Sequence, residues 1–252
     1  MQQEPHFSSA QFFQEEHPTL SLVNLIEIGK FAVLTLRTFG TDKMKKSYIF
    51  DIDGTLIDTE RTGVESLILT VKELMDMDMP YEEAYGYFGF PSGRVPYMLE
   101  YHNPQEFMEL WERNFISLKH LSSAFPGVEK VLCKLHQAGC KIGCVTSRNR
   151  YEFDNDEHLK PLLKYIEVDI CVEDCTNHKP HPEPALTFLE RAGMKAEDCT
   201  FIGDTIQDCL CAHAAGMPFL LADWHKRGKR NIPADAVATD AKQMLAILTE
   251  HL

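Results

Sequence analysis

The chain has 252 residues, of which 44% are hydrophobic, and its formal net charge at pH 7 is -13. This length suits one large domain or a core with a smaller insert, and the apolar fraction is sufficient for a sizeable core. The acidic balance argues against nucleic acid or an anionic membrane as a partner, since both need a positive surface. A small phosphorylated substrate remains compatible with it, because a local cation can offset the overall field.

Residues 1–43 stand apart from the rest of the sequence. Within them, residues 20–36 are apolar but include Glu27 and Lys30, and this stretch is too short and too charged for a membrane span. From Met44 onward the chain resembles a natural start that leads into a first strand. Residues 1–43 are therefore either an extension, such as an upstream in-frame translation, or a genuine helix packed on the core, and both interpretations stay open.

The eight cysteines are expected to be reduced. No secretory signal is visible and several cysteines lie in apolar runs, which favours buried thiols in a cytoplasmic protein. The stretch from Cys171 to His181 has a Cys, Cys, His, His pattern, but structural zinc ligands are usually spaced differently. A zinc site there is disfavoured.

The predicted elements begin with a short buried strand at residues 48–50. Residues 58–121 then have helical periodicity, interrupted at residues 79–99 by glycines and prolines that predict a loop. Asn103 and Pro104 predict the start of a further helix in this region, as a cap and a first helical residue.

From residue 125 the pattern changes to alternating strands and helices. Strands are predicted at residues 141–147, 168–172, 199–204 and 218–223, and helices at residues 129–139, 182–193, 205–216 and 240–252. Such alternation with uniformly apolar strands predicts an α/β fold, a Rossmann-like parallel sheet with helices on both faces. The predicted domains are a catalytic core at 44–58 and 123–252 and an inserted helical cap at 59–122.

Polar side chains follow the predicted strands, at the sheet edge where ligands bind in such folds. These residues are Asp51, Asp53, Thr146, Ser147, Lys179, Asp204 and Asp208. Carboxylates that crowd together raise one another's pKa, so a fold tolerates the cluster only where a cation and a lysine balance it. Carboxylate oxygens without His or Cys favour Mg²⁺ over zinc. Gly54 permits a tight turn whose backbone N–H groups can face an anion.

These residues resemble the four motifs of the haloacid dehalogenase superfamily. "DIDGT" from Asp51 to Thr55 is similar to the first motif, Thr146 to the second, Lys179 in "HKPHPEP" to the third and "GDTIQD" from Gly203 to Asp208 to the fourth. The resemblance spans residues 44–252. "DGTLIDTE", the position of the helical insert and "AAGM" resemble the subgroup with a small helical cap, which includes phosphoglycolate phosphatases, pyrophosphatases and sugar-phosphate phosphatases.

The resemblance implies a Mg²⁺-dependent phosphatase that hydrolyses a small phosphate monoester through an aspartyl-phosphate. Asp51 would be the nucleophile and Asp53 the general acid and base, with a pKa raised by neighbouring carboxylates. Mg²⁺ would be held by Asp51, the Asp53 carbonyl and Asp204, with Asp208 positioning Lys179 or the metal's water shell. The substrate phosphate would be bound by five further residues: Gly54, Thr55, Thr146, Ser147 and Lys179.

Two alternatives remain. Sugar phosphomutases of the superfamily share Asp53, but they use a cap histidine where this chain has Gly63. The other alternative is a non-catalytic regulatory protein that binds phosphate. In the cap, Arg94 is a candidate for binding a carboxylate or second phosphate, with a solvated turn as the competing interpretation. Arg148 and Arg150 are interpreted as loop residues. The expected partner is a small phosphorylated metabolite, and the expected assembly a monomer or homodimer.

Overall fold

The computed structural model describes residues 47–87, 92–226, 228 and 231–250. The predicted extension at residues 1–43 lies outside these ranges. None of the helices in the described ranges combines the length and the apolar character that a membrane crossing needs.

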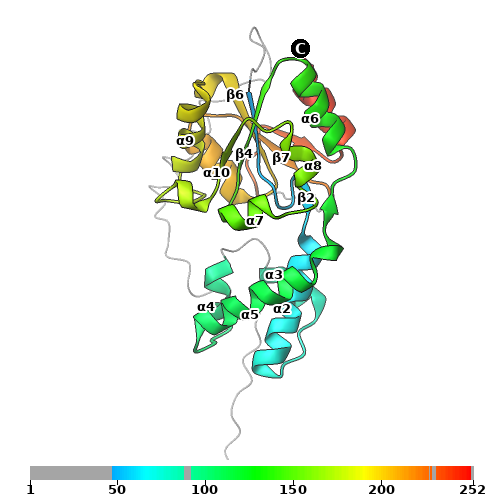
Figure 1. Ribbon diagram of the computed structural model, residues 1–252, viewed down its shortest axis with the longest axis vertical. Coiled ribbons are helices and arrows are strands. Elements are labelled where there is room, and N and C mark those ends of the chain that lie inside the picture. Colours follow the sequence, from blue (N-terminus) through cyan, green and yellow to red (C-terminus); the bar gives the residue numbers. More distant parts are fainter. Residues whose placement is uncertain (1–46, 88–91, 227, 229–230, 251–252) are drawn as a thin grey trace, which may run out of the picture. The chain divides into compact units, whose positions relative to one another are not determined.

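A six-stranded sheet with the order β5-β4-β1-β6-β7-β8 forms the centre of the fold, and all its neighbouring strands are parallel. The strands are β1 (Ser47–Phe50), β4 (Lys141–Val145), β5 (Val168–Ile170), β6 (Cys199–Gly203), β7 (Phe219–Ala222) and β8 (Ala236–Ala238). The parallel α/β prediction is confirmed (Figure 1). Strand β8 was not predicted, because its three residues are too few to show a period and only the last is buried.

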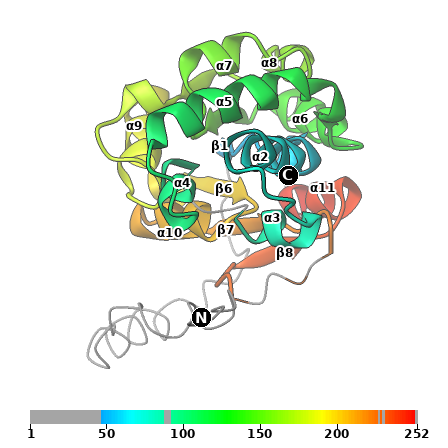
Figure 2. The same cartoon turned by 90° about the horizontal axis from the view of Figure 1, so that it is seen from below.

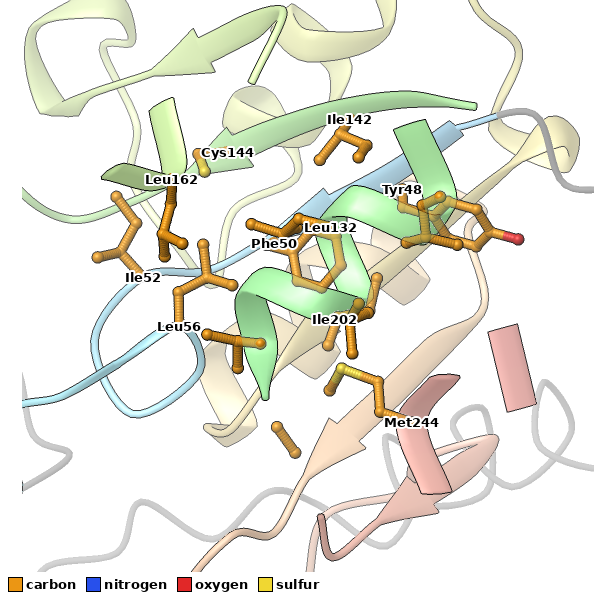
Figure 3. Packing of buried hydrophobic residues seen from close by; sticks show 14 of the residues in the cluster. Tyr48, Phe50, Ile52, Leu56, Leu132, Ile142, Cys144, Leu162, Ile202 and Met244 are labelled. Atoms are coloured by element: carbon orange, nitrogen blue, oxygen red, sulfur yellow. The ribbon is translucent and has the colours of Figure 1, made fainter. Parts of the chain in front are cut away.

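Helices cover both faces of this sheet. They are α6 (Val128–Gln137), α7 (Arg150–Asp154), α8 (Lys160–Leu163), α9 (Glu183–Ala192), α10 (Ile206–Ala214) and α11 (Ala241–Thr249), with short 3-10 turns η3 (Val172–Asp174) and η4 (Ala196–Asp198). Successive β1 side chains point to opposite faces. Tyr48 and Phe50 pack with α6 and α11, whereas Ile49 packs with α9 and α10. Figure 3 shows Phe50 beside Leu132 of α6 in the first of these clusters.

The insert between β1 and the rest of the sheet is helical. It consists of α2 (Glu60–Met75), α3 (Tyr81–Tyr87), η1 (Ser92–Arg94), α4 (Val95–Met98), α5 (Pro104–Ser117) and η2 (Lys119–Leu121). The predicted cap at Asn103 is confirmed, since its side chain accepts a hydrogen bond from Glu106 N. The predicted loop at residues 79–99 is wrong in part, because α3 and α4 lie within it. Pro96 is tolerated there because it occupies the first turn of α4, where its missing N–H has no helical acceptor.

Helices α2 and α5 lie side by side in this insert, as Figure 2 shows. Apolar residues such as Val64, Leu67 and Phe107 form its core. Polar groups buried between the two helices are paired: Trp111 Nε1 donates to Ser66 Oγ at 2.9 Å, and Asn114 Nδ2 to Thr70 Oγ1 at 3.1 Å. The insert therefore has its own small core.

A two-stranded antiparallel ribbon connects the insert to the sheet domain. It pairs β2 (Ile57–Asp58) with β3 (Ser123–Ala124), and was not predicted because each strand has only two residues. Phe125 N donates to Leu56 O at 3.0 Å, and Trp224 Nε1 donates to Thr55 O at 2.9 Å. The Trp224 and Phe125 rings lie 5.4 Å apart. The two segments that connect the insert to the sheet domain are thus hydrogen-bonded to each other, and Trp224 is hydrogen-bonded to the loop that follows β1.

Candidate active site

Asp51 is the first residue after β1, and the loop that follows it is fixed by a close backbone contact. Asp51 N donates to Ile202 O at 2.8 Å, which continues the pairing with β6. Gly54 has φ +77°, and a Cβ there would lie 2.5 Å from the Asp204 carboxylate. Only glycine fits this position, both for its conformation and for its space. The tight turn expected at Gly54 therefore brings the loop directly against Asp204.

Three carboxylates converge at this end of the sheet. Asp51, Asp204 and Asp208 each offer an oxygen within 4.8 Å of the others, and all three side chains are buried. They come from the residue after β1, the residue after β6 and the first turn of α10. Buried carboxylate oxygens without sulfur or imidazole form a donor set that suits a hard divalent cation such as Mg²⁺. In the described residues no other group of this kind is found, so Cys171 and His181 form no comparable cluster.

Lys179 bridges two of these acids. Its Nζ donates to Asp51 Oδ1 at 2.6 Å, to Asp208 Oδ1 at 2.7 Å and to Val145 O at 3.3 Å. Asp208 also accepts from Thr205 N and Oγ1, at the cap of α10. The geometry thus places Asp208 where it holds Lys179, which was one of the two roles expected for it.

Burial and the neighbouring opposite charge shift the pKa values of Asp51 and Lys179 in opposite directions. Burial raises the pKa of Asp51, the Lys179 charge lowers it, and Asp208 and Asp204 raise it further, so that the pKa lies well above its usual value. Burial lowers the pKa of Lys179, but Asp208 and Asp51 outweigh burial and raise it. Lys179 is therefore a permanent cation here. A divalent cation beside Asp51 would favour the ionised carboxylate that a nucleophile needs.

Thr146 and Ser147 follow β4 next to the acid cluster. The Thr146 side chain is buried, and its Oγ1 accepts a hydrogen bond from Arg148 N at 3.1 Å. Ser147 is exposed, and it lines the cavity described below together with Asp53. Thr55 has no exposed surface. Of the expected phosphate-binding side chains, Ser147 is accessible and Thr55 lies within the protein.

Asp53 has a partner that sequence reasoning missed. Arg148 donates from Nε and Nη2 to the two oxygens of Asp53, at 2.8 and 2.7 Å, and from Nη1 to Asp156 at 2.7 Å. Arg148 is 8% exposed and Asp156 1%. Arg148 lies in the loop after β4 as expected, but it is a buried ion-pair partner and does not merely decorate that loop. The interpretation of Arg150 as a loop residue is wrong, because Arg150 begins α7 and binds Asp169 and Asp174. The sequence offered no signal for this contact beyond the position of Arg148, two residues after Thr146 at a strand end.

The expectation of a raised pKa for Asp53 is wrong as well. Burial would raise the pKa of Asp53, but the charge and hydrogen bonds of Arg148 outweigh burial and lower it. A carboxylate that receives two hydrogen bonds from a guanidinium is held in its ionised form. The neighbouring carboxylates act mainly on Asp51 instead.

A cavity of about 610 Å³ lies between the insert and the sheet domain. Asp53, Ser147 and Arg148 line its floor. Its other wall is formed largely by apolar side chains of α2 and α5, namely Val64, Leu67, Met108, Trp111, Phe115 and Ile116. Arg94, the expected anion-binding residue of the cap, is exposed in η1 and is not among the residues that line this cavity. Asp51, Lys179, Asp204 and Asp208 are not among the residues that line this cavity, and Asp53 is the expected catalytic residue that does.

Fold and site together combine a parallel α/β sheet with a helical insert and with a buried aspartate that a lysine holds among further carboxylates. A family model described as haloacid dehalogenase-like hydrolase matches residues 48–222. The chain belongs to this family.

Curated relatives share most of the chain. The PpaX protein of Caldanaerobacter subterraneus subsp. tengcongensis is 32% identical over 180 residues, covering 70% of this chain and 80% of the relative. Pyrophosphatase PpaX of Bacillus cereus (strain B4264) is 27% identical, covering 80% of this chain and 95% of the relative. The expected class, a phosphatase of the haloacid dehalogenase superfamily, is confirmed at this level.

Solved structures agree on the fold. A crystal structure of a Lactobacillus plantarum protein, assigned as a phosphoglycolate phosphatase, has a TM-score of 0.74 at 22% identity and covers 81% of this chain and 100% of its own. CbbY from Rhodobacter sphaeroides, solved in complex with phosphate, has a TM-score of 0.68 at 18% identity and covers 82% of this chain and 100% of its own. At these identities the likeness shows the shared fold.

Proposed function

We propose that this chain is a Mg²⁺-dependent phosphatase that hydrolyses a small-molecule phosphate monoester through an aspartyl-phosphate on Asp51. The observation that carries the proposal is the pairing of Asp51 with Lys179 at 2.6 Å among Asp204 and Asp208. Candidate substrates suggested by the named relatives are pyrophosphate and phosphoglycolate, and sugar phosphates follow from the subgroup that the motifs resemble.

In the first step an Asp51 oxygen attacks phosphorus, the bond from phosphorus to the leaving oxygen breaks, and Asp53 gives that oxygen a proton. In the second step the Asp53 carboxylate takes a proton from water, the resulting hydroxide attacks the same phosphorus, and the bond to Asp51 breaks. Free phosphate leaves, and Asp53 is protonated again. A covalent intermediate divides one difficult displacement into two easier ones.

The other residues of the site position the reacting groups and stabilise the charge of the transferring phosphate. Lys179 fixes the Asp51 carboxylate and can stabilise a transferring phosphate oxygen, while Asp208 holds Lys179 in place. Ser147 is accessible to bind a phosphate oxygen, and Thr146 orients the backbone beside it. Asp51, Asp204 and the Asp53 carbonyl would hold Mg²⁺, which neutralises the charge between a carboxylate nucleophile and an anionic phosphate.

The paired state of Asp53 suits the second step, because a general base must be ionised. Proton donation in the first step requires Asp53 to take up a proton and to loosen its contact with Arg148. Arg148 is thus a positioning residue, which keeps Asp53 aimed into the cavity.

The test is phosphate release from a panel of esters, with and without Mg²⁺, by the wild type and by Asp51→Asn. Asp78→Asn is the control, because Asp78 is 90% exposed in the insert. We expect Mg²⁺-dependent release that Asp51→Asn abolishes and Asp78→Asn preserves. Release by Asp51→Asn would contradict the proposal. Isomerisation of sugar phosphates without release would favour the mutase alternative, and the absence of any turnover would favour the regulatory one.

The proposal includes a small phosphorylated metabolite as partner, a monomer or homodimer as assembly, and the cytoplasm as location. Light scattering of the eluting protein during size-exclusion chromatography measures the assembly directly.

A further inference from the structure

The cavity wall that the insert contributes opposite Asp53 is mostly apolar, with Gln105, Glu109 and Glu112 of α5 as its polar members. On α5, residues at helical spacing face the cavity: Met108, Trp111, Phe115 and Ile116. Val64 and Leu67 of α2 continue this surface. The Trp111 indole N–H is already bound to Ser66, so the ring contributes an apolar surface. A leaving group that reaches these side chains would meet mainly carbon atoms, with the carboxylates of Glu109 and Glu112 beside them.

Large apolar side chains also lie exposed on both sides of the cavity. Ile116 of α5 is 54% exposed and Tyr151 of α7 is 70% exposed, and both line the cavity. Exposed apolar groups that face one cavity from two domains gain free energy when a ligand of similar character covers them.

The charged groups of the cavity are mostly acidic. Carboxylates are contributed by Asp53, Glu109, Glu112 and Glu152, and cations by Arg148 and Lys119. Arg148 is already bound to two carboxylates, Asp53 and Asp156. Lys119 Nζ lies 3.9 Å from the same Asp156. An incoming leaving group that carries its own negative charge would therefore meet more carboxylates than cations, since Arg148 is already paired with two carboxylates and Lys119 lies near one of them.

We propose that this cavity selects phosphate monoesters whose leaving alcohol is bulky, carries an aromatic or aliphatic group and bears no negative charge. The inference rests on the proposed phosphatase function and narrows its substrate class. Pyrophosphate and phosphoglycolate, for which relatives are named, have a second anionic group where this wall is apolar and acidic. They would be poor substrates of this chain.

The test compares kcat/KM for benzyl phosphate, ethyl phosphate, phosphoglycolate and pyrophosphate, by phosphate release with Mg²⁺. Benzyl and ethyl phosphate both release primary alcohols, so their ratio reports mainly the contact with the cavity wall. We expect benzyl phosphate to exceed ethyl phosphate by about tenfold or more, as burial of a phenyl ring implies. Phosphoglycolate and pyrophosphate should be no better than ethyl phosphate.

Two variants localise the effect. Ile116→Ser should lower the ratio of benzyl to ethyl phosphate by about threefold while the value for ethyl phosphate is retained. Glu112→Lys should raise kcat/KM for phosphoglycolate relative to ethyl phosphate by about fivefold, because it replaces a repulsive charge by an attractive one. Arg113→Ala is the control on the same helix; Arg113 is 71% exposed and does not line the cavity.

The outcomes separate the two proposals. Equal or better turnover of phosphoglycolate or pyrophosphate than of benzyl phosphate would overturn the inference and leave the phosphatase intact. Equal turnover of benzyl and ethyl phosphate would also overturn it. Phosphate release from none of the four compounds would overturn the proposed function and the inference with it.

Discussion

The sheet edge, which carries the paired charges, and the insert wall of the cavity, which is mostly apolar, differ in how many other side chains each position could accept. At the sheet edge each charge has a partner: Lys179 is held by Asp51 and Asp208, and Arg148 by Asp53 and Asp156. On the insert wall most residues share apolar character and helical spacing, with Glu109 and Glu112 among them. Buried charges need particular partners at particular distances, whereas an apolar wall tolerates many side chains of similar volume. Chemistry is therefore fixed at the first surface, and substrate choice can vary at the second.

The largest effect is expected at Lys179. Lys179→Met removes a cation that is 7% exposed and leaves two buried carboxylates facing each other. We expect kcat to fall by about 10²- to 10³-fold, and the free energy of unfolding by about 3 kcal/mol. Phosphate release measures kcat, and urea denaturation measures the free energy of unfolding. Lys160→Met, at a lysine that pairs only with exposed Glu157, is the control and should change neither. A Lys179→Met enzyme with normal kcat would place the chemistry elsewhere.

The close approach of Gly54 to Asp204 gives the next effect. Gly54→Ala forces a Cβ to within 2.5 Å of the Asp204 carboxylate at φ +77°. Displacement of this loop should lower kcat/KM by about 100-fold, since a shift of about 1 Å at a reacting group has this effect. Gly86→Ala is the matched control, because a Cβ there meets nothing within 4 Å and Gly86 lies in α3. Equal loss in both variants would show that the effect is not local.

A substitution of Arg148 tests whether this residue controls the pKa of Asp53, the acid of the sheet edge that also lines the cavity below the insert. Arg148→Gln removes the charge that lowers the pKa of Asp53, so that pKa should rise. A base must be deprotonated, and the acid limb of the kcat–pH profile should therefore move to higher pH. The profile is measured with a saturating ester. Arg150→Gln, whose arginine binds Asp169 and Asp174 instead, should leave the limb in place. An unchanged limb in Arg148→Gln would show that Asp53 does not set it.

The smallest effect concerns an ion pair outside the site. Hydrogen bonds to Asp235, and then to Cys209, raise the pKa of His213 to about 10. A raised folded-state pKa means that this contribution to stability is complete below the unfolded-state pKa of about 6.5 and is lost as pH rises through the folded-state value. The His213 side chain is 35% exposed, so the contribution is about 1 kcal/mol or less after solvent screening.

His213→Gln should therefore lower Tm more at pH 6 than at pH 10.5, which differential scanning calorimetry measures. His136→Gln, at an exposed residue of α6, is the control. An equal loss of Tm at both pH values would show that His213 stabilises the fold by packing alone.

Uniformly buried strands and the acids that follow them were predictable, and partly exposed or two-residue strands were not. Strands β1 and β6 are buried at every residue, and the acids that follow them must lie at one edge of a parallel sheet. Strand β8 is buried only at its last residue, and β2 and β3 have two residues each. The role of Arg148 depends on where its side chain meets Asp53, 95 residues away, and sequence spacing carries no information on that contact. The error on the pKa of Asp53 follows from the same missed contact.

The central claim is that Asp51 becomes phosphorylated during turnover. The most direct measurement is rapid acid quenching of the enzyme with benzyl phosphate and Mg²⁺, followed by peptide mass spectrometry. The account predicts a phosphoryl group on the peptide that contains Asp51, present only during turnover and absent in Asp51→Asn. Hydrolysis without any phosphorylated peptide, or with the phosphoryl group on another residue, would contradict it.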